Sequence, residues 1–186
     1  MLKQKDNPNQ IHSSSNDNII IDFSAYPQLF RSVQYDKFTN YLNDSEDFFR
    51  KLKYVFESLI PHVSRYTYNN ITNGTSGHTH VIHDDTREMR LIKGIIKKKL
   101  ENEGYEDKYI ENFFINNINE YEIWQFGVIS DVRIFGTRYL NRFRPIFIDY
   151  HHLVYPSDKY NQPNYKSYGF CPIKGGCKGE RSKQKC

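Results

Sequence analysis

The sequence predicts an α+β fold in which helices pack on one face of a small twisted antiparallel sheet. Apolar residues recur every three or four positions over residues 48–60, 86–103 and 107–118, and from Tyr121 onward they recur every second position. Helical segments that precede a run of strands are typical of α+β domains. Short connections between the strands favour an antiparallel meander, because parallel neighbours need long crossovers.

The chain has 186 residues, which is enough for one packed domain and few for two. Residues 1–18 are rich in Asn, Ser and Gln and offer little apolar surface to bury, so we expect a disordered arm. We predict a single α+β domain over residues 19–163 and a flexible basic tail over residues 164–186. Because that tail has few apolar residues, truncation after Pro163 is expected to leave the fold intact.

The helices are predicted from apolar spacing. Residues 48–60 carry apolar side chains at helical spacing, and Asp44 or Ser45 can cap the helix start. Two further helices are expected over residues 86–103 and 107–118 on the same grounds.

The strands are predicted from their composition and from alternation. Residues 19–23 are β-branched and aromatic, which predicts a short first strand. The meander is expected to use residues 121–128, 132–138 and 143–149, with a last short strand at 153–155. Pro145 lacks a ladder donor, so it should lie at an edge or a bulge.

The charge and the cysteines concentrate in the tail. Six basic residues and one acidic residue follow Tyr165, so this tail carries a net charge of +5 and the rest of the chain carries −1, which together give the net charge of +4. The three cysteines are Cys171, Cys177 and Cys186. Their odd number argues against a disulfide framework, and their spacing lacks the close pairs typical of zinc sites.

Several classes of protein are excluded by what the sequence lacks. No apolar run approaches the roughly 20 residues of a membrane helix, and the N-terminus does not resemble a signal peptide. We therefore expect a cytoplasmic protein with no membrane partner. The phosphate-binding, dinucleotide-binding and nucleophile-elbow glycine motifs are missing, which argues against P-loop hydrolases, Rossmann enzymes and α/β-hydrolases.

An arginine cluster is the first candidate functional feature. Arg133, Arg138, Arg142 and Arg144 are four of the ten arginines in the chain and lie within twelve residues. Guanidinium groups bind phosphate in bidentate fashion, so this cluster indicates a nucleic-acid backbone as ligand. The alternative is that these are solvated strand residues, because alternation places charge outward with or without a ligand.

The second feature is the pair Asp149 and His152 at the end of the last long strand. A turn could bring the carboxylate to the imidazole and raise the pKa of the histidine toward neutrality, as a general acid or base requires. The alternative is that Asp149 caps the turn and a histidine packs beside it. His151 and His152 could not face the same way in an extended segment.

A third feature is the pair His78 and His80, which would share one face of a strand. Such a pair can chelate zinc with a third ligand from elsewhere, but histidines in Gly- and Thr-rich loops are also common. None of the fuller metalloenzyme spacings is present, so no metal and no other cofactor is predicted.

Motifs spread between Ile19 and Pro156 resemble those of an uncharacterised family of bacterial and mobile-element proteins. They are Phe23-Ser24, Trp124-Gln125-Phe126, Arg133-x-x-Gly136, Asp149-x-x-His152 and Tyr155-Pro156. The family usually has proline after the aspartate, where this chain has Tyr150.

The C-terminal meander also resembles the sheet of RelE/ParE-type toxins, which cut messenger RNA or poison gyrase. That resemblance implies that Arg133 binds or stabilises the scissile phosphate, while His152 or Tyr155 handles protons during attack by the RNA 2′-hydroxyl. With Asp149, these residues form the predicted catalytic set, and the other three arginines of the cluster are predicted to bind nucleic acid.

Two classes of function therefore stay open. The first is a toxin or phage-defence protein that acts on RNA as a metal-independent endoribonuclease, with the ribosome and a cognate antitoxin as candidate partners. The second is a non-catalytic domain of a mobile element that binds nucleic acid or a protein through the same surface.

Overall fold

A computed structural model describes residues 17–24, 26, 29–71, 78–128, 130–157, 161 and 164–173. Its main sheet has five strands in the order β1-β7-β6-β5-β4, and β2 and β3 form a separate two-stranded ribbon. The strands are β1 (Ile20–Ile21), β2 (Gln34–Tyr35), β3 (Phe38–Thr39), β4 (His80–Ile82), β5 (Ile123–Phe126), β6 (Arg133–Tyr139) and β7 (Arg142–Asp149). The α+β class predicted from the sequence is confirmed.

The helices follow the predicted spacing. The α-helices are α1 (Ser45–Tyr54), α2 (Ile60–Val63), α3 (Tyr68–Asn70), α4 (Arg87–Asn102) and α5 (Asp107–Phe113). Two π-helical segments, η1 (Val55–Leu59) and η3 (Phe114–Ile118), continue α1 and α5, and η4 (Tyr165–Ser167) is a 3-10 helix. Asp44 caps α1 as predicted, because its carboxylate accepts the backbone N–H of Asp47 at 2.8 Å. Thr86 caps α4 in the same way through the N–H of Met89, at 3.1 Å.

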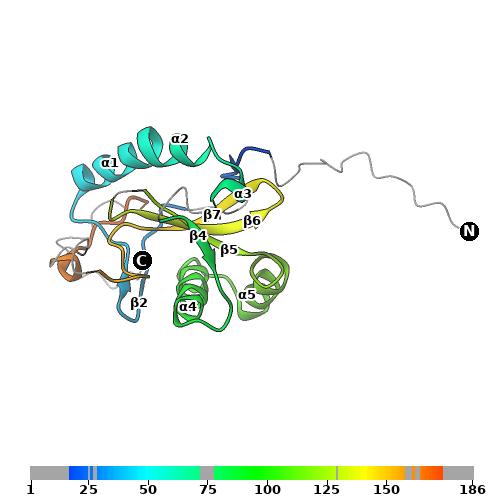
Figure 1. Ribbon diagram of the computed structural model, residues 1–186. Helices are drawn as coiled ribbons and strands as arrows, with labels where there is room; N and C mark the ends of the chain where they lie inside the picture. The colour runs from blue at the N-terminus through cyan, green and yellow to red at the C-terminus, as the bar shows by residue number, and fades with distance from the viewer. Residues whose placement is uncertain are drawn as a thin grey trace, which may run out of the picture.

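The helices cover both faces of the sheet, which corrects the prediction of a single covered face. In Figure 1, α1 and α2 lie over one face, and α4 and α5 lie over the other. Trp124 and Phe126 pack with Leu59 in one apolar core, whereas Ile123 and Phe135 belong to a second core with the isoleucines of α4. Every residue of β5 is buried, as expected for a strand between two helical layers.

The sheet is mixed, which corrects the prediction of an antiparallel sheet. β1 runs parallel to β7, with Ile20 beside Arg142, whereas the meander β5-β6-β7 is antiparallel as predicted. Pro145 pairs with Gly136 next to a register shift in β6, so its predicted place at a bulge is confirmed. Residues 153–155 form a bend rather than the predicted short strand.

Residues 164–173 pack on the domain, although their composition predicts a flexible tail. Phe170 and Leu42 exchange two backbone hydrogen bonds of 2.9 and 3.0 Å, and Cys171 is fully buried. The packed part of the chain therefore continues to Cys171. Residues 1–16 of the expected arm and 174–186 of the expected tail, with Cys177 and Cys186, lie outside the described residues.

This packing reverses the expectation for truncation. A chain ending at Pro163 should be less stable than a chain ending at Ile173 by about 2–4 kcal/mol, because it loses the Leu42 bridge and the burial of Cys171. Urea denaturation of the two chains measures the difference. Equal midpoints and slopes would contradict the docking of this segment.

Within the described ranges, no helix is long and apolar enough to cross a membrane.

Candidate functional site

The predicted catalytic residues gather at one end of the sheet. Arg133 begins β6 and is paired in register with Asp149, the last residue of β7. The loop that follows β7 carries His152 and Tyr155, and His80 begins β4 at the same end, opposite Gln125 of β5. The fold thus brings Arg133, Asp149, His152 and Tyr155 together, and it adds His80 from a distant part of the chain.

Asp149 holds the loop after β7. Its side chain is fully buried, and its two oxygens accept the backbone N–H groups of His151 at 3.0 Å, Leu153 at 2.7 Å and Val154 at 2.9 Å. Burial raises the pKa of Asp149 to about 6, although these hydrogen bonds and the charge of Arg133 act in the opposite direction. Of the two interpretations of this carboxylate, the geometry favours the turn cap.

Arg133 is a buried cation with a fixed position. The side chain is 1% exposed, and its Nη1 donates to the carbonyl oxygens of Ser130 at 2.5 Å and Val132 at 2.8 Å. Its stem lies across Gly127, where a Cβ would approach the Cδ of Arg133 to 2.4 Å. Gly127 is therefore required by the close approach of this arginine.

His152 has a defined tautomer. Its Nδ1 contacts the carbonyl oxygen of Tyr155, which can only accept, so Nδ1 carries the proton and Nε2 keeps its lone pair in the neutral ring. The backbone at His152 is left-handed, with φ of 58°. Burial and then the charge of Arg133 lower the pKa of His152, whereas a carboxylate partner was predicted to raise it.

His80 and Tyr155 complete the cluster. Their rings meet edge to face with centroids 5.4 Å apart, and His80 is exposed. Burial lowers the pKa of His80 first, with further lowering by the charges of Arg133, His83 and His78. Burial raises the pKa of Tyr155, and the charge of Glu88 on α4 adds to this. We call Arg133, His80, His152 and Tyr155 the histidine–arginine cluster.

The cluster suits an anion better than a metal ion. The charge of Arg133 disfavours protonation of both histidines, and the same field repels a metal cation and attracts a phosphate. Across the parts of the chain that the structure describes, no group of three or more His, Cys, Asp or Glu side chains is arranged to hold a metal ion. His78 and His80 therefore lack a described third ligand.

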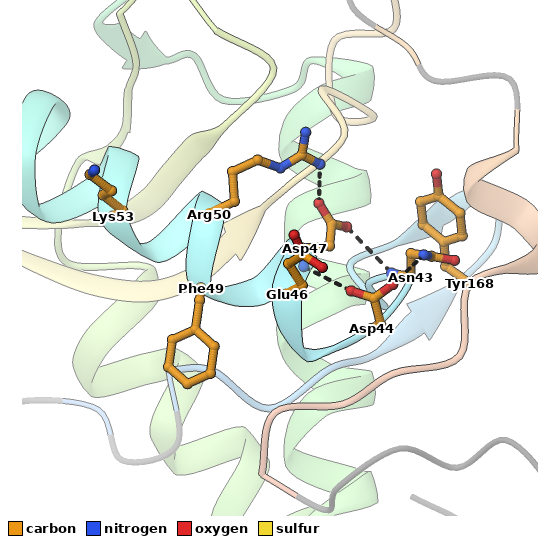
Figure 2. Close-up of a pocket in the computed structure, with 8 residues that line it drawn as sticks. All are labelled: Asn43, Asp44, Glu46, Asp47, Phe49, Arg50, Lys53 and Tyr168. Carbon is orange, nitrogen blue, oxygen red and sulfur yellow. Dashed lines mark hydrogen bonds and ion pairs between the residues drawn. The ribbon is translucent and has the colours of Figure 1, made fainter.

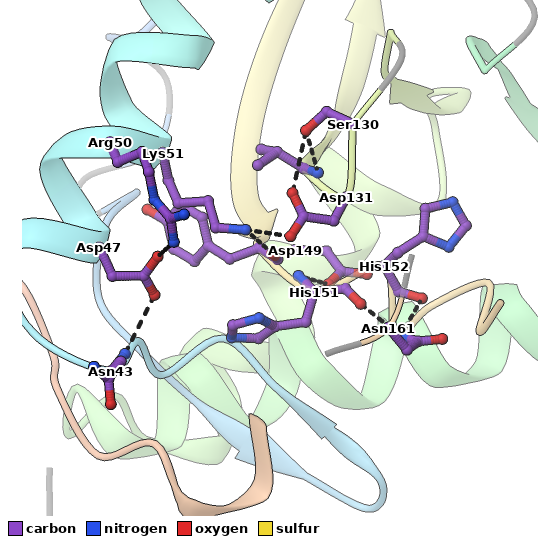
Figure 3. Close-up of polar contacts among 12 residues, drawn as sticks. Asn43, Asp47, Arg50, Lys51, Ser130, Asp131, Asp149, His151, His152 and Asn161 are labelled. Carbon is purple, nitrogen blue, oxygen red and sulfur yellow. Dashed lines mark hydrogen bonds and ion pairs between the residues drawn. The ribbon is translucent and has the colours of Figure 1, made fainter. Parts of the chain in front are cut away.

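The loop after β7 is fixed by contacts from two other segments (Figure 3). Buried Lys51 of α1 donates to the Asp131 carboxylate and, at 3.0 Å, to the Tyr150 carbonyl. The Nδ2 group of Asn161 donates to the carbonyl of His151 at 2.6 Å. Sequence reasoning missed Lys51 and Asp131, because 80 residues separate them and no local pattern links them.

His151 and His152 point in opposite directions (Figure 3), as predicted, although the segment is a turn and not a strand. His151 is fully buried, and its Nε2 donates to the carbonyl of Tyr41 at 2.7 Å. Its ring also packs against those of Tyr165 and Tyr168, with centroids 6.1 and 5.5 Å away. His151 therefore anchors the C-terminal segment and takes no part in the cluster.

The other three arginines of the predicted site lie toward the opposite, hairpin end of β6 and β7. Arg138 forms an ion pair with Glu122 at 3.0 Å and lies 4.2 Å from the centre of the Tyr68 ring. Arg142 and Arg144 each lie 3.8 Å from the Asp22 carboxylate. The structure thus separates these arginines from Arg133 and pairs all three with carboxylates.

A pocket elsewhere, at the N-terminus of α1, has an acidic lining (Figure 2). Asp44, Glu46 and Asp47 contribute carboxylates, of which Asp44 caps the helix and Asp47 accepts from Arg50 at 2.5 Å. Two of its three carboxylates are thus engaged in local contacts, and Arg50 and Lys53 add positive charge to the same lining.

Comparison with known proteins identifies the family. No solved structure matches the chain. The uncharacterized protein UU032 of Ureaplasma parvum serovar 3 is 31% identical over 163 residues, which cover 87% of this chain and 84% of that protein. The family model described as uncharacterised protein UU032 matches residues 24–177, a span that contains the whole histidine–arginine cluster. The predicted relation to an uncharacterised family is confirmed, and the chain belongs to the UU032 family of uncharacterised proteins.

Proposed function

We propose that this protein binds RNA and cleaves its phosphodiester bonds without a metal ion, with the histidine–arginine cluster as the reaction site. The observation that carries the proposal is the tautomer of His152. Its Nδ1–H is donated to the Tyr155 carbonyl, so Nε2 is the ring nitrogen that carries the lone pair, beside a buried positive charge and on a side chain that is 8% exposed.

The reaction balances with groups that the chain itself supplies. His152 Nε2 takes the proton of a ribose 2′-hydroxyl as that oxygen attacks the adjacent phosphorus. The bond from phosphorus to the 5′-oxygen breaks, and the hydroxyl of Tyr155 gives its proton to the leaving oxygen. The raised pKa of Tyr155 keeps that hydroxyl protonated, and the products are a 2′,3′-cyclic phosphate and a 5′-hydroxyl.

Arg133 and Asp149 have supporting parts in this proposal. Because Arg133 is 1% exposed, it does not contact the RNA directly. Its positive charge stabilises the phosphate under attack through electrostatic attraction at a distance. Exposed His80 is placed to contact the phosphate instead. Asp149 is a positioning residue, since it fixes the backbone of the loop that carries His152 and Tyr155.

The toxin part of the proposal depends on resemblance. An antiparallel meander with an arginine at the start of its middle strand supports a relation to RelE/ParE-type toxins. A ribosome, a cognate antitoxin and a setting in phage defence or a mobile element are further parts of the same proposal. Growth arrest on inducible expression, relieved by His152→Asn, would support them, and unaffected growth would count against them.

A non-catalytic RNA-binding domain is the second candidate. The observation in its favour is the burial of Arg133 and Asp149, which both serve the fold.

Cleavage in the presence of EDTA distinguishes the two candidates. We expect the full chain to cut a labelled single-stranded RNA in EDTA, with a rate that falls as pH drops through a value below 6.5. The rate falls in acid because His152 acts as a base only when its ring is neutral. The fall occurs below pH 6.5 because the pKa of His152 is lowered. Rates measured between pH 4.5 and 8 check this. A rate that rises toward acid, or no cleavage at any pH, would contradict the assignment of His152 as the base.

A further inference from the structure

Helix α4 carries a row of cations along one exposed side. Arg87, Arg90, Lys93 and Lys97 follow one another at three- and four-residue spacing, so they lie on one face over about 15 Å. Arg87, Arg90 and Lys97 are exposed, and Lys93 is half-buried. Lys37, at the tip of the β2–β3 ribbon, lines the same surface.

These cations have no carboxylate partners among the described residues. None of the five forms an ion pair within 4.0 Å in that part of the chain, although Arg90 donates to the Asp85 carbonyl at 2.9 Å. The arginines at the hairpin end of the sheet, in contrast, all pair with carboxylates. The charge on α4 is therefore available to an anionic ligand at lower cost, because no ion pair has to break first.

Tyr35 lies across the middle of this row. A Cβ at Gly94 would approach Cε1 of Tyr35 to 2.2 Å, so the ring rests directly on the helix backbone where α4 has no side chain. The turn after Tyr35 is tight, since Asp36 has a φ of 51°. Tyr35 is 39% exposed, which leaves aromatic surface open between the cations.

Two hollows flank Tyr35, and one of them extends to the loop that carries His152 and Tyr155. One is lined by Lys37, Arg87 and Arg90 together with Leu153 and Pro156, which belong to the same loop as His152 and Tyr155. The other follows α4 toward its C-terminus.

That second hollow is lined by Arg90, Lys93 and Lys97, and its far wall carries Asp107 and Glu111 of α5. In this second hollow the positive charge therefore lies on the α4 side and the negative charge on the α5 side, whereas in the first hollow the exposed Asp36 lies among the cations.

We propose that Tyr35 and the cations of α4 bind single-stranded RNA, with an unpaired base stacked on Tyr35 and the backbone running along α4 toward His152. Flat aromatic surface between cations is the chemistry by which proteins bind unpaired strands, whereas bases inside a duplex are not free to stack on a side chain. This inference depends on the proposed function in that it names the form of the substrate.

Binding to an uncleavable strand tests the inference separately from cleavage. The probe is a fluorescent 2′-O-methyl oligouridine, which lacks the attacking hydroxyl, and its affinity for the full chain is measured at several salt concentrations. The double variant R87Q/R90Q should bind at least about tenfold more weakly, with a salt slope lower by roughly 1.4. The control K53Q/K108Q removes two exposed lysines elsewhere and should bind as the parent chain does.

The aromatic contact has its own pair of variants. Tyr35→Ala should weaken binding of the single strand by about tenfold and leave binding of a duplex of the same length unchanged, whereas Tyr35→Phe should bind normally. Equal affinity in R87Q/R90Q and the parent chain, or equal losses in K53Q/K108Q, would overturn the inference. Tighter binding of the duplex than of the single strand would also overturn it. So would binding of single-stranded DNA and RNA that depends only on the tail beyond residue 173.

The two proposals fail in distinguishable ways. If binding depends on Arg87, Arg90 and Tyr35 but ordinary RNA is not cleaved, the proposed nuclease activity is wrong and the proposed RNA-binding surface stands. If substitution of all three residues leaves RNA cleavage unchanged, the proposed RNA-binding surface is wrong and the proposed nuclease activity stands.

Discussion

His152→Asn should lower the rate of RNA cleavage by about 10²- to 10⁴-fold while leaving the affinity for uncleavable RNA unchanged. The loss follows because Asn cannot act as a base in place of Nε2. Asparagine is the appropriate replacement, since His152 has a φ of 58° and asparagine tolerates that left-handed backbone better than most residues. Single-turnover cleavage and fluorescence binding measure the two quantities.

The matched control is His62→Gln, which removes an imidazole from α2, outside the histidine–arginine cluster. It should cleave as the parent chain does. Thermal melts must show that His152→Asn is folded, because its ring also contacts the Tyr155 carbonyl. A folded His152→Asn protein with full cleavage activity would refute the role of this histidine.

Asp149→Ala should lower the free energy of unfolding by on the order of 3–5 kcal/mol, the largest stability effect expected in this chain. The substitution removes the acceptor of three buried N–H groups and leaves a buried arginine beside the gap. Urea denaturation measures the loss, and Asp84→Ala, at an exposed aspartate, provides the control.

Asp149→Asn separates positioning from chemistry. Its one remaining carbonyl oxygen can still accept from part of the loop, so its stability and its cleavage rate should both fall between those of the parent chain and Asp149→Ala. Normal stability in Asp149→Ala would mean that the loop does not depend on this carboxylate.

Local sequence patterns predicted the helices, the meander and the position of Pro145 because these depend on neighbours in the chain. Alternation in β5 indicated one buried face, yet Ile123 and Gln125 on the other face are also buried, and Ile123 packs with the isoleucines of α4. Alternation of apolar residues along a strand therefore does not show whether helices also cover the other face of the sheet.

The rest of the site depends on pairings that leave no local signal. β1 joins the sheet beside β7 although more than 120 residues separate Ile20 from Arg142. The bridge between Leu42 and Phe170 and the contact of Lys51 with Asp131 are of the same kind. The resemblance to RelE/ParE-type toxins grouped Arg133, Asp149, His152 and Tyr155 in one predicted site. In the structure the register of β6 and β7 pairs Arg133 with Asp149, and the other two residues lie in the loop that follows.

The most direct test of metal-independent cleavage by the histidine–arginine cluster is the chemistry of the product ends. The parent chain and His152→Asn are incubated in EDTA with an RNA oligonucleotide and with the same oligonucleotide carrying 2′-O-methyl groups, and the fragments are weighed by mass spectrometry. We predict 2′,3′-cyclic phosphate and 5′-hydroxyl ends from the unmodified RNA with the parent chain alone. Intact RNA, 5′-phosphate ends, or equal cleavage of the methylated strand would contradict the account.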